Sequence, residues 1–267
     1  MASEIKVDTI SEKTSTSGVT IDSLGIKDGK ITNLMNATLS AADLGVGLHI
    51  KTADSSAATH TSADELVLEN AGHCGISILS ATDGTGNIYF NDSGGVARGY
   101  FEYNHDTDKL SVGTAGANGL VIDSTGAVTK PLQPCFSVVP ASQQSNVSTG
   151  TQIAFGTELF DLNGDFASNT FTAPVTGKYF LGHSLRLQEV DADYTYFMVQ
   201  ITTSNRAYYH IQDTGTYDED AAYMEWTNGV VADMDANDTC DLAVAFVGGA
   251  NQVDISTNSF FYGYLIC

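Results

Sequence analysis

Three clusters of acidic residues in the second half of the chain offer the oxygen atoms that hard cations prefer as ligands. The clusters are Glu189 to Asp193, Asp218 to Asp220, and Asp233 to Asp238. The first two supply the candidate ligands for calcium or magnesium, which are Asp191, Asp193, Asp218 and Asp220. Their spacing does not match an EF-hand loop. The alternative is that these are solvated acidic loops that hold no ion.

A run of aromatic residues between positions 208 and 226 suggests a second kind of site. Aromatic rings beside carboxylates and amides suit stacking on sugar rings and hydrogen bonding to sugar hydroxyls. The candidate binding residues are Tyr208, Tyr209, Tyr217, Asp218 and Trp226. The alternative is that the rings pack in a core or between copies of the chain.

The residue types that perform catalysis are not grouped in this sequence. The 6 histidines lie far apart, and no GxSxG, HExxH, phosphate-binding or dinucleotide-binding motif is present. The 4 cysteines have no CxxC spacing, so neither a zinc site nor a disulfide framework is indicated. We therefore predict that the protein is not an enzyme.

The charge of the chain argues against one class of partner. Its 32 acidic residues exceed its 11 basic residues and give a formal net charge of −21. A field of this sign repels phosphate backbones, so nucleic acid is not an expected partner. The sequence shows no secretory signal and no apolar run near the roughly 20 residues that cross a bilayer. We expect a chain made in soluble form in a cytoplasm, without membrane insertion.

The prolines indicate where the chain divides. All 4 of them lie after residue 130, and Pro131 and Pro134 fall within a short segment typical of a linker. We therefore predict a boundary at residues 131–134, with one region before it and another, 135–267, after it. Strands at intervals of 8–15 residues in the second region favour a sandwich or jelly roll.

The region before residue 130 contains short alternating apolar runs separated by turn residues. Its large apolar side chains are sparse, so one copy would bury too little surface to offset about 1–2 kcal/mol of backbone ordering per residue. Identical chains that wind together would share their apolar stripes and remove this deficit. We predict an all-β fold, with an elongated, parallel, homotrimeric shaft of short strands; the alternative is a disordered segment.

This region resembles phage tail-fibre and related virion-fibre proteins. The resemblance rests on several short motifs: Ile5 to Thr14, Gly18 to Asp22, Ile26 to Ile31, Gly75 to Gly94, Tyr100 to Asp108, and Leu120 to Gly126. It implies a virion-anchoring segment over residues 1–45 and a β-rich shaft over residues 46–130. In the anchor, Ile5, Val7 and Ile10 are expected to add a strand to a tail, baseplate or capsid protein.

Residues 135–267 resemble the jelly-roll head of the complement subcomponent-q and tumour necrosis factor superfamily. The matching residues are Phe155, Asp161, Phe166, Phe171, Pro174, Gly177, Tyr179, Leu181, Asn237, Asp238 and the closing run Ser259 to Ile266. In that superfamily three heads pack through aromatic residues of inner strands. The resemblance implies such contacts for Tyr179, Tyr262 and Tyr264.

Together these features predict a trimeric phage tail-fibre protein located on the virion. Its N-terminus is expected to attach to the particle, and its head to bind a glycan or protein receptor on the host cell, with the aromatic candidates above as receptor-binding residues. Two alternatives share this architecture: a capsid fibre or decoration protein without a dedicated receptor, and a fibre of a contractile injection system.

Overall fold

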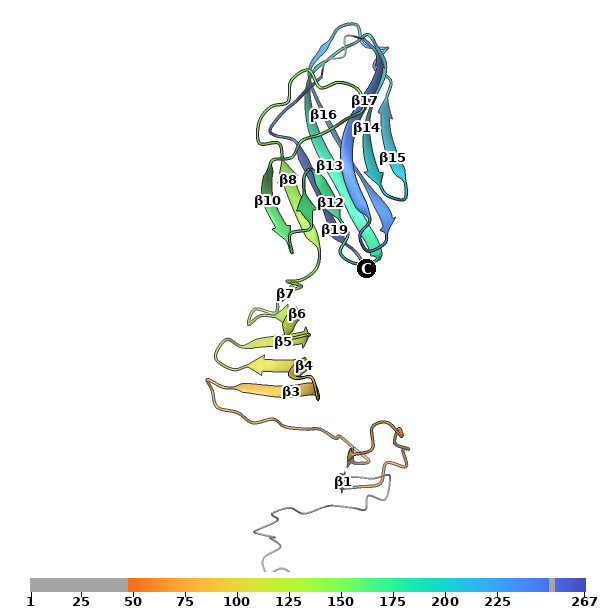
Figure 1. Cartoon of the computed structure of the whole chain (residues 1–267). Helices are drawn as coiled ribbons and strands as arrows, with labels where there is room; N and C mark the ends of the chain where they lie inside the picture. The colour runs from red at the N-terminus through yellow and green to blue at the C-terminus, as the bar shows by residue number, and fades with distance from the viewer. Residues whose placement is uncertain (1–47, 250–252) are drawn as a thin grey trace, which may run out of the picture. The chain divides into compact units, whose positions relative to one another are not determined.

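The computed structural model describes residues 48–249 and 253–267 (Figure 1). The chain divides into two compact units, Met1–Ser77 and Ile78–Cys267. All the regular secondary structure of the described residues is β, which confirms the all-β part of the prediction. Within these residues no helix is long and apolar enough to cross a membrane. The predicted anchoring segment, with Ile5, Val7 and Ile10, lies outside the described residues.

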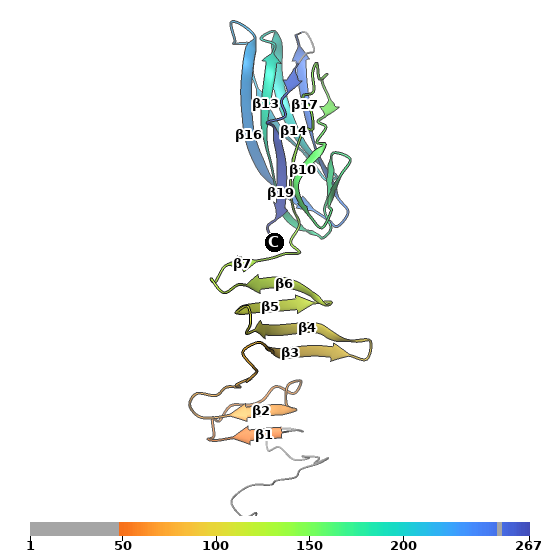
Figure 2. The same cartoon turned by 90° about the vertical axis from the view of Figure 1, so that its left-hand side faces the viewer.

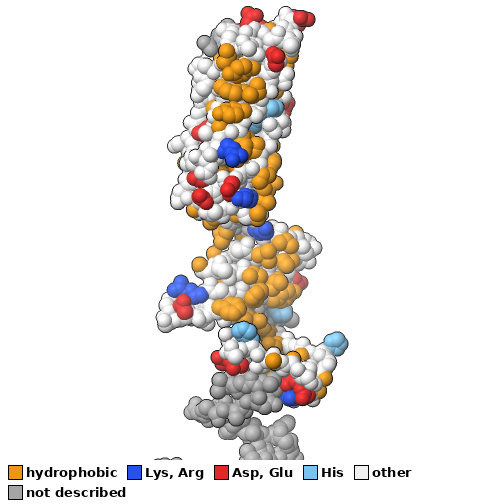
Figure 3. Space-filling view, turned by 90° about the vertical axis from the view of Figure 1, so that its right-hand side faces the viewer, with side chains coloured by type: hydrophobic (Ala, Val, Ile, Leu, Met, Phe, Trp, Pro, Cys, Tyr) orange, Lys and Arg blue, Asp and Glu red, His pale blue; other side chains and the backbone are white. Residues whose placement is uncertain are grey.

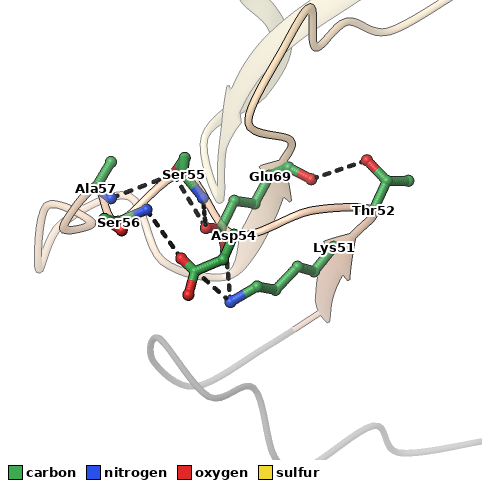
Figure 4. A network of polar contacts seen from close by, with 7 residues as sticks. All are labelled: Lys51, Thr52, Asp54, Ser55, Ser56, Ala57 and Glu69. Carbon is green, nitrogen blue, oxygen red and sulfur yellow. Dashed lines mark hydrogen bonds and ion pairs between the residues drawn. The ribbon is translucent and has the colours of Figure 1, made fainter.

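In the described part of the first unit, β1 (Leu48–Lys51) and β2 (Leu66–Glu69) pair in parallel. A polar network ties the loop between them to the end of β2 (Figure 4). The Glu69 carboxylate, in a residue only 7% exposed, accepts hydrogen bonds from the Ser55 backbone N–H at 2.6 Å and from Ser55 Oγ at 3.0 Å. The Lys51 ammonium lies 3.4 Å from its other oxygen. The Ser55 donors and Lys51 lower the pKa of Glu69 to about 2.

We expect Glu69→Gln to loosen this loop. Because the folded pKa of about 2 lies below the ordinary value of 4.5, the stabilisation from the carboxylate is complete above pH 4.5 and is lost as the pH falls toward 2. Hydrogen exchange of the Ser55 amide in the full chain should be several-fold faster in Glu69→Gln at pH 6. Glu65→Gln, at an exposed position four residues earlier, is the matched control. Equal protection in all three proteins would contradict the role of Glu69.

The second unit begins with a five-stranded antiparallel meander (Figure 2). Its strands, in chain order and in spatial order, are β3 (Thr85–Asp92), β4 (Gly95–Asn104), β5 (Lys109–Thr114), β6 (Ala117–Ile122) and β7 (Val128–Thr129). Asp and Gly residues make the turns. The Asp123 carboxylate, for example, accepts from the backbone N–H groups of Thr125 and Ala127 at 2.8 and 3.0 Å, and Gly126 takes a φ of 86°, which favours glycine.

The rest of the second unit is a sandwich of two sheets. The first, here called the β13 sheet, has the order β10 (Thr157–Leu162), β8 (Cys135–Val139), β19 (Phe260–Leu265), β13 (Gly177–Val190), β16 (Ala221–Met234), with β18 (Asp254–Ile255) also paired to β13. The second, the β14 sheet, has the order β11 (Phe166–Ala167), β12 (Thr170–Thr172), β17 (Thr239–Gly248), β14 (Tyr194–Thr203), β15 (Ala207–Gln212), with β9 (Thr151–Gln152) paired to β17.

The chain crosses repeatedly between these two sheets, which is the arrangement of a jelly roll. Alternate residues of the long strands point inward, as the burial pattern of β13 shows. The core between the sheets is rich in aromatic rings: Phe136 stacks on Phe171 with ring centroids 4.7 Å apart, and Tyr194 stacks on Phe246 at 4.5 Å. The predicted sandwich is therefore confirmed.

Tyr179 belongs to this core and not to a surface. It has no exposed area, its ring lies 5.6 Å from that of Phe171, and its hydroxyl donates to the Val175 carbonyl at 2.7 Å. A ring enclosed by its own chain is not available to a second copy. The structure therefore corrects the expectation that Tyr179 contacts another head.

Candidate functional site

One face of the meander is apolar and exposed. The register of the strands places eight large side chains on this face, namely Ile88, Phe90, Phe101, Tyr103, Leu110, Val112, Leu120 and Ile122. We call it the apolar face of the meander. Phe90 is 57% exposed and Phe101 is 46% exposed. The buried hydrophobic core of the described residues includes no residue from this sheet, and Figure 3 shows hydrophobic side chains gathered over this part of the chain.

The β13 sheet of the head also carries large apolar side chains on its outer surface. We call this set the aromatic face of the head; it consists of Phe160, Leu162, Phe180, Val231, Phe260, Tyr262 and Tyr264. Phe180 lies opposite both Tyr264 and Val231 in the register. Its ring centroid is 5.5 Å from that of Tyr264 and 6.3 Å from that of Tyr262. Tyr264 is 46% exposed.

Two glycines let these rings lie close to the sheet. A Cβ atom on Gly182 would stand 2.6 Å from the ring of Tyr262, and one on Gly229 would stand 2.6 Å from the ring of Phe180. Real Cβ atoms do not approach other atoms so closely, so each ring occupies the space that a side chain would need. The result is a broad apolar surface without projecting side chains at these two positions.

Replacing Gly229 with Ala is expected to push the Phe180 ring out of this surface. The ring tip lies on the outer surface and can move aside, so the cost should fall below the roughly 1–3 kcal/mol of overpacking in a closed core. We expect a slightly lower melting temperature and weaker association of the chain. Differential scanning fluorimetry and sedimentation velocity would measure the two effects. The control is Gly215→Ala, whose added methyl group would meet nothing closer than 3.4 Å. Equal melting temperatures and equal association of Gly229→Ala and Gly215→Ala would contradict a role for the position of the Phe180 ring.

The structure separates the aromatic residues of positions 208–226 instead of gathering them. Tyr208 packs against the core, and Tyr209 is 58% exposed on β15 of the β14 sheet. Tyr217 lies in the loop between β15 and β16, where its backbone N–H donates to the Thr214 carbonyl at 3.0 Å. Asp218 is exposed in the same loop. These residues do not form one surface.

Trp226 lies inside the sandwich. It is 8% exposed, and its ring centroid is 4.9 Å from that of Phe197 and 5.2 Å from that of His210. An indole in this position contributes to the core and offers no face to a ligand. This corrects the expectation that Trp226 binds a receptor.

Two of the four acidic candidates for a metal site, Asp191 and Asp220, accept hydrogen bonds from loop backbone. Asp191 accepts from the Asp193 backbone N–H at 2.7 Å, and Asp220 accepts from the Ala192 backbone N–H at 2.9 Å. Over residues 48–249 and 253–267, no group of three or more His, Cys, Asp or Glu side chains is placed to hold a metal ion. The four carboxylates named from the sequence, those of Asp191, Asp193, Asp218 and Asp220, therefore do not form a common site.

A pair of histidines lies between the two sheets, and no spacing in the sequence predicts it. His183 on β13 is 1% exposed, and its ring centroid is 6.2 Å from that of His210 on β15. The Nδ1 atoms of both rings are buried and have no hydrogen-bond partner among the described residues. Burial, and secondarily the nearby His210, lowers the pKa of His183 to about 4.

The two-sheet topology and the inward aromatic residues define a jelly-roll β-sandwich head attached to a strand meander. The globular domain of a zebrafish complement 1qA protein is similar to it at 18% identity and a TM-score of 0.40, over 51% of this chain and 98% of that one. Murine APRIL at pH 8.5 matches at 13% identity and a TM-score of 0.37, over 50% of this chain and 99% of that one. No protein-family model and no curated protein sequence matches the chain.

Proposed function

We propose that the chain is the subunit of a homotrimeric phage fibre that attaches to the virion by its N-terminal segment and binds a host-cell receptor with its head. The observation that carries this proposal is the apolar face of the meander. Eight large apolar side chains lie on one face of this sheet, and none of them belongs to the buried hydrophobic core of the described residues. A face of this kind marks an interaction site.

Copies of the same chain are the partner that suits this face best. Four residues of this face, Ile88, Phe90, Phe101 and Tyr103, are exposed, and the other four are half-buried. Burying an exposed large apolar side chain contributes roughly 1.5–3 kcal/mol, so covering this face would offset part of the ordering cost of the sheet. Closed cyclic symmetry supplies the same partner to every copy and leaves no apolar face uncovered. Three sheets around one axis cover each other in this way.

The aromatic face of the head supports the same assembly. Tyr262 and Tyr264 lie on it, and their predicted role in contacts between heads stays a prediction. Three linked heads would present three copies of any receptor site, and linkage raises the effective concentration of the second and third contacts. The exposed loop of Tyr217 and Asp218 remains available for a receptor in such an assembly.

The oligomeric state of the full chain tests the first part of the proposal. Sedimentation equilibrium should give a mass near three times 28.2 kDa, and a well-folded monomer at micromolar concentration would overturn it. The second part needs the particle and the cell. Immunogold labelling should place the chain on a phage fibre, and fluorescently labelled full chain should adsorb to susceptible bacteria. Labelling elsewhere on the particle, or no adsorption to any susceptible strain, would overturn that part.

A further inference from the structure

A small polar pocket opens on the outer surface of the β13 sheet, away from the aromatic face. Its volume is about 320 Å³, and its walls come from Gln143, Gln188, Glu189, Ala222, Tyr223 and Asp254. Gln188 lies eight residues along β13 from Phe180, which corresponds to about 27 Å of strand. The volume lies at the lower end of the range of roughly 300–1,000 Å³ for small-ligand sites.

A row of three residues across neighbouring strands forms the centre of this pocket. Gln188 on β13 is the register partner of Asp254 on β18 and of Tyr223 on β16. Cross-strand partners point to the same side of a sheet. An amide, a carboxylate and an aromatic ring therefore stand next to one another on one surface.

The aromatic ring of this row is exposed and held in place. Tyr223 is 64% exposed, and the Arg186 guanidinium lies 5.2 Å from its ring centroid. A cation over an aromatic face contributes about 0.5–1 kcal/mol at exposed sites. The contact fixes the orientation of a ring that would otherwise rotate freely, and a ring fixed in advance loses less entropy on binding.

The polar groups beside the ring are also held in advance. The Asp254 carboxylate is 8% exposed and accepts three hydrogen bonds, from Gln143 Nε2 at 2.8 Å, Ser145 Oγ at 3.0 Å and the Asn146 backbone N–H at 2.8 Å. The Gln188 side-chain amide makes no hydrogen bond within the part of the chain that the structure describes. It therefore offers one donor group and one acceptor to a ligand.

The backbone at the pocket wall is in a strained conformation. Glu189 has a φ of 53°, and the register of β13 against β16 pairs Gln188 and Val190 but passes over Glu189. The pairing of β13 with β16 keeps the same register on both sides of Glu189, so this residue lies within a continuous pair of strands. A non-glycine residue with positive φ costs of order 1–3 kcal/mol, and such residues cluster at ligand sites.

From this arrangement we infer that the pocket of Tyr223 binds a neutral sugar of a cell-surface glycan. The ring offers a flat apolar platform, and Gln143, Gln188 and Glu189 offer the donors and acceptors that sugar hydroxyls need. The chain carries a net charge of −21, and the carboxylates of Glu189 and Asp254 line the pocket. They outweigh the guanidinium of Arg186 over the ring, so the balance of charge disfavours acidic sugars. The inference rests on the proposed receptor-binding function and assigns its site to residues that the sequence did not single out.

The test uses the full chain and a panel of soluble oligosaccharides. The neutral probes are oligomers of glucose, galactose, mannose and N-acetylglucosamine, and the acidic probes are sialylated and uronic-acid oligomers. Isothermal titration should show binding to at least one neutral probe. Tyr223→Ala should weaken that binding by about tenfold or more, whereas Tyr223→Phe, which keeps the ring, should stay within about threefold. The matched control is Tyr209→Ala, at a tyrosine that is 58% exposed on the other sheet.

Three results would overturn the inference: binding to none of the neutral probes, a preference for acidic probes, or equal affinity of the wild type and Tyr223→Ala. Adsorption to bacteria separates these failures from a failure of the proposed function. If the wild type and Tyr223→Ala adsorb equally well, the sugar site is wrong and the attachment role stands. If neither adsorbs but the oligosaccharide binding depends on Tyr223, the sugar site stands and the attachment role is wrong.

Discussion

Phe101→Asp is expected to convert the full chain from a trimer into a monomer at micromolar concentration. Phe101 lies at the middle of the apolar face of the meander, between Ile88 on β3 and Val112 on β5. In the proposed trimer the substitution places three carboxylates inside an apolar interface. An unpaired charge in such a place costs several kcal/mol, and the burial of three phenyl rings, at roughly 1.5–3 kcal/mol each, is lost as well.

The opposite face of the same sheet offers a matched control. Tyr89 is adjacent to Ile88 in β3, so it points to the other side of the sheet. It is 47% exposed, against 46% for Phe101. Tyr89→Asp should leave the trimer intact in sedimentation equilibrium, and Phe101→Asp should not. If Phe101→Asp remained a trimer with unchanged melting temperature, the apolar face would not be an interface between copies.

The alternation of residues in the head was readable from the sequence, and it predicted the sandwich well. Tyr194, Phe197, Val199 and Ile201 fill the inner surface of β14 as an alternating pattern requires, apart from the shift in register between Tyr194 and Tyr196. The same pattern would have placed Tyr179 correctly. It shares its parity with Leu181 and Leu185, which are also fully buried. The resemblance to a family with aromatic contacts between heads suggested the wrong side of the strand for this residue.

Strand parity also explains why Trp226, which was predicted to bind a receptor, is buried while Tyr223 of the same aromatic run is exposed. In β16, Trp226, Ala232 and Met234 are buried, so even positions point inward. Tyr223 is at an odd position and therefore points outward, where it forms the proposed sugar site. Composition alone treats both residues as members of one aromatic segment. Only their parity within a strand separates a core residue from a surface residue.

Clusters of residues that depend on how the strands pair could not be predicted from the sequence. His183 and His210 are separated by 26 residues and lie in different sheets, so no spacing rule brings them together. The row of Asp254, Gln188 and Tyr223 depends in the same way on the register of three strands. The acidic runs show the opposite error. Asp191 and Asp193 are close in sequence, but the Asp191 carboxylate accepts the backbone N–H of Asp193, and the two do not form a metal site.

The head is expected to lose stability in acid because of His183. The pKa of this histidine is about 4 in the folded chain, against an ordinary value of 6.5, because burial disfavours the imidazolium and His210 lies nearby. The folded state therefore binds the proton less well than the unfolded state. The contribution of neutral His183 to the stability of the fold is complete above pH 6.5 and is lost as the pH falls from 6.5 toward 4. The difference between the folded and the ordinary pKa of His183 corresponds to about 3 kcal/mol of unfolding free energy.

His183 also hydrogen-bonds to the backbone of Trp226. His183→Gln should remove the acid sensitivity, because glutamine does not titrate and keeps an N–H donor for that backbone. Urea unfolding of the full chain, followed through the fluorescence of its 1 tryptophan, would report directly on this region, since Trp226 lies 5.2 Å from His210. Between pH 7 and pH 4 the wild type should lose about 3 kcal/mol more than His183→Gln does. His105→Gln, in the meander, should follow the wild type. If the unfolding free energies of the wild type and His183→Gln fell in parallel as the pH is lowered, His183 would be protonated in the folded head without loss of stability.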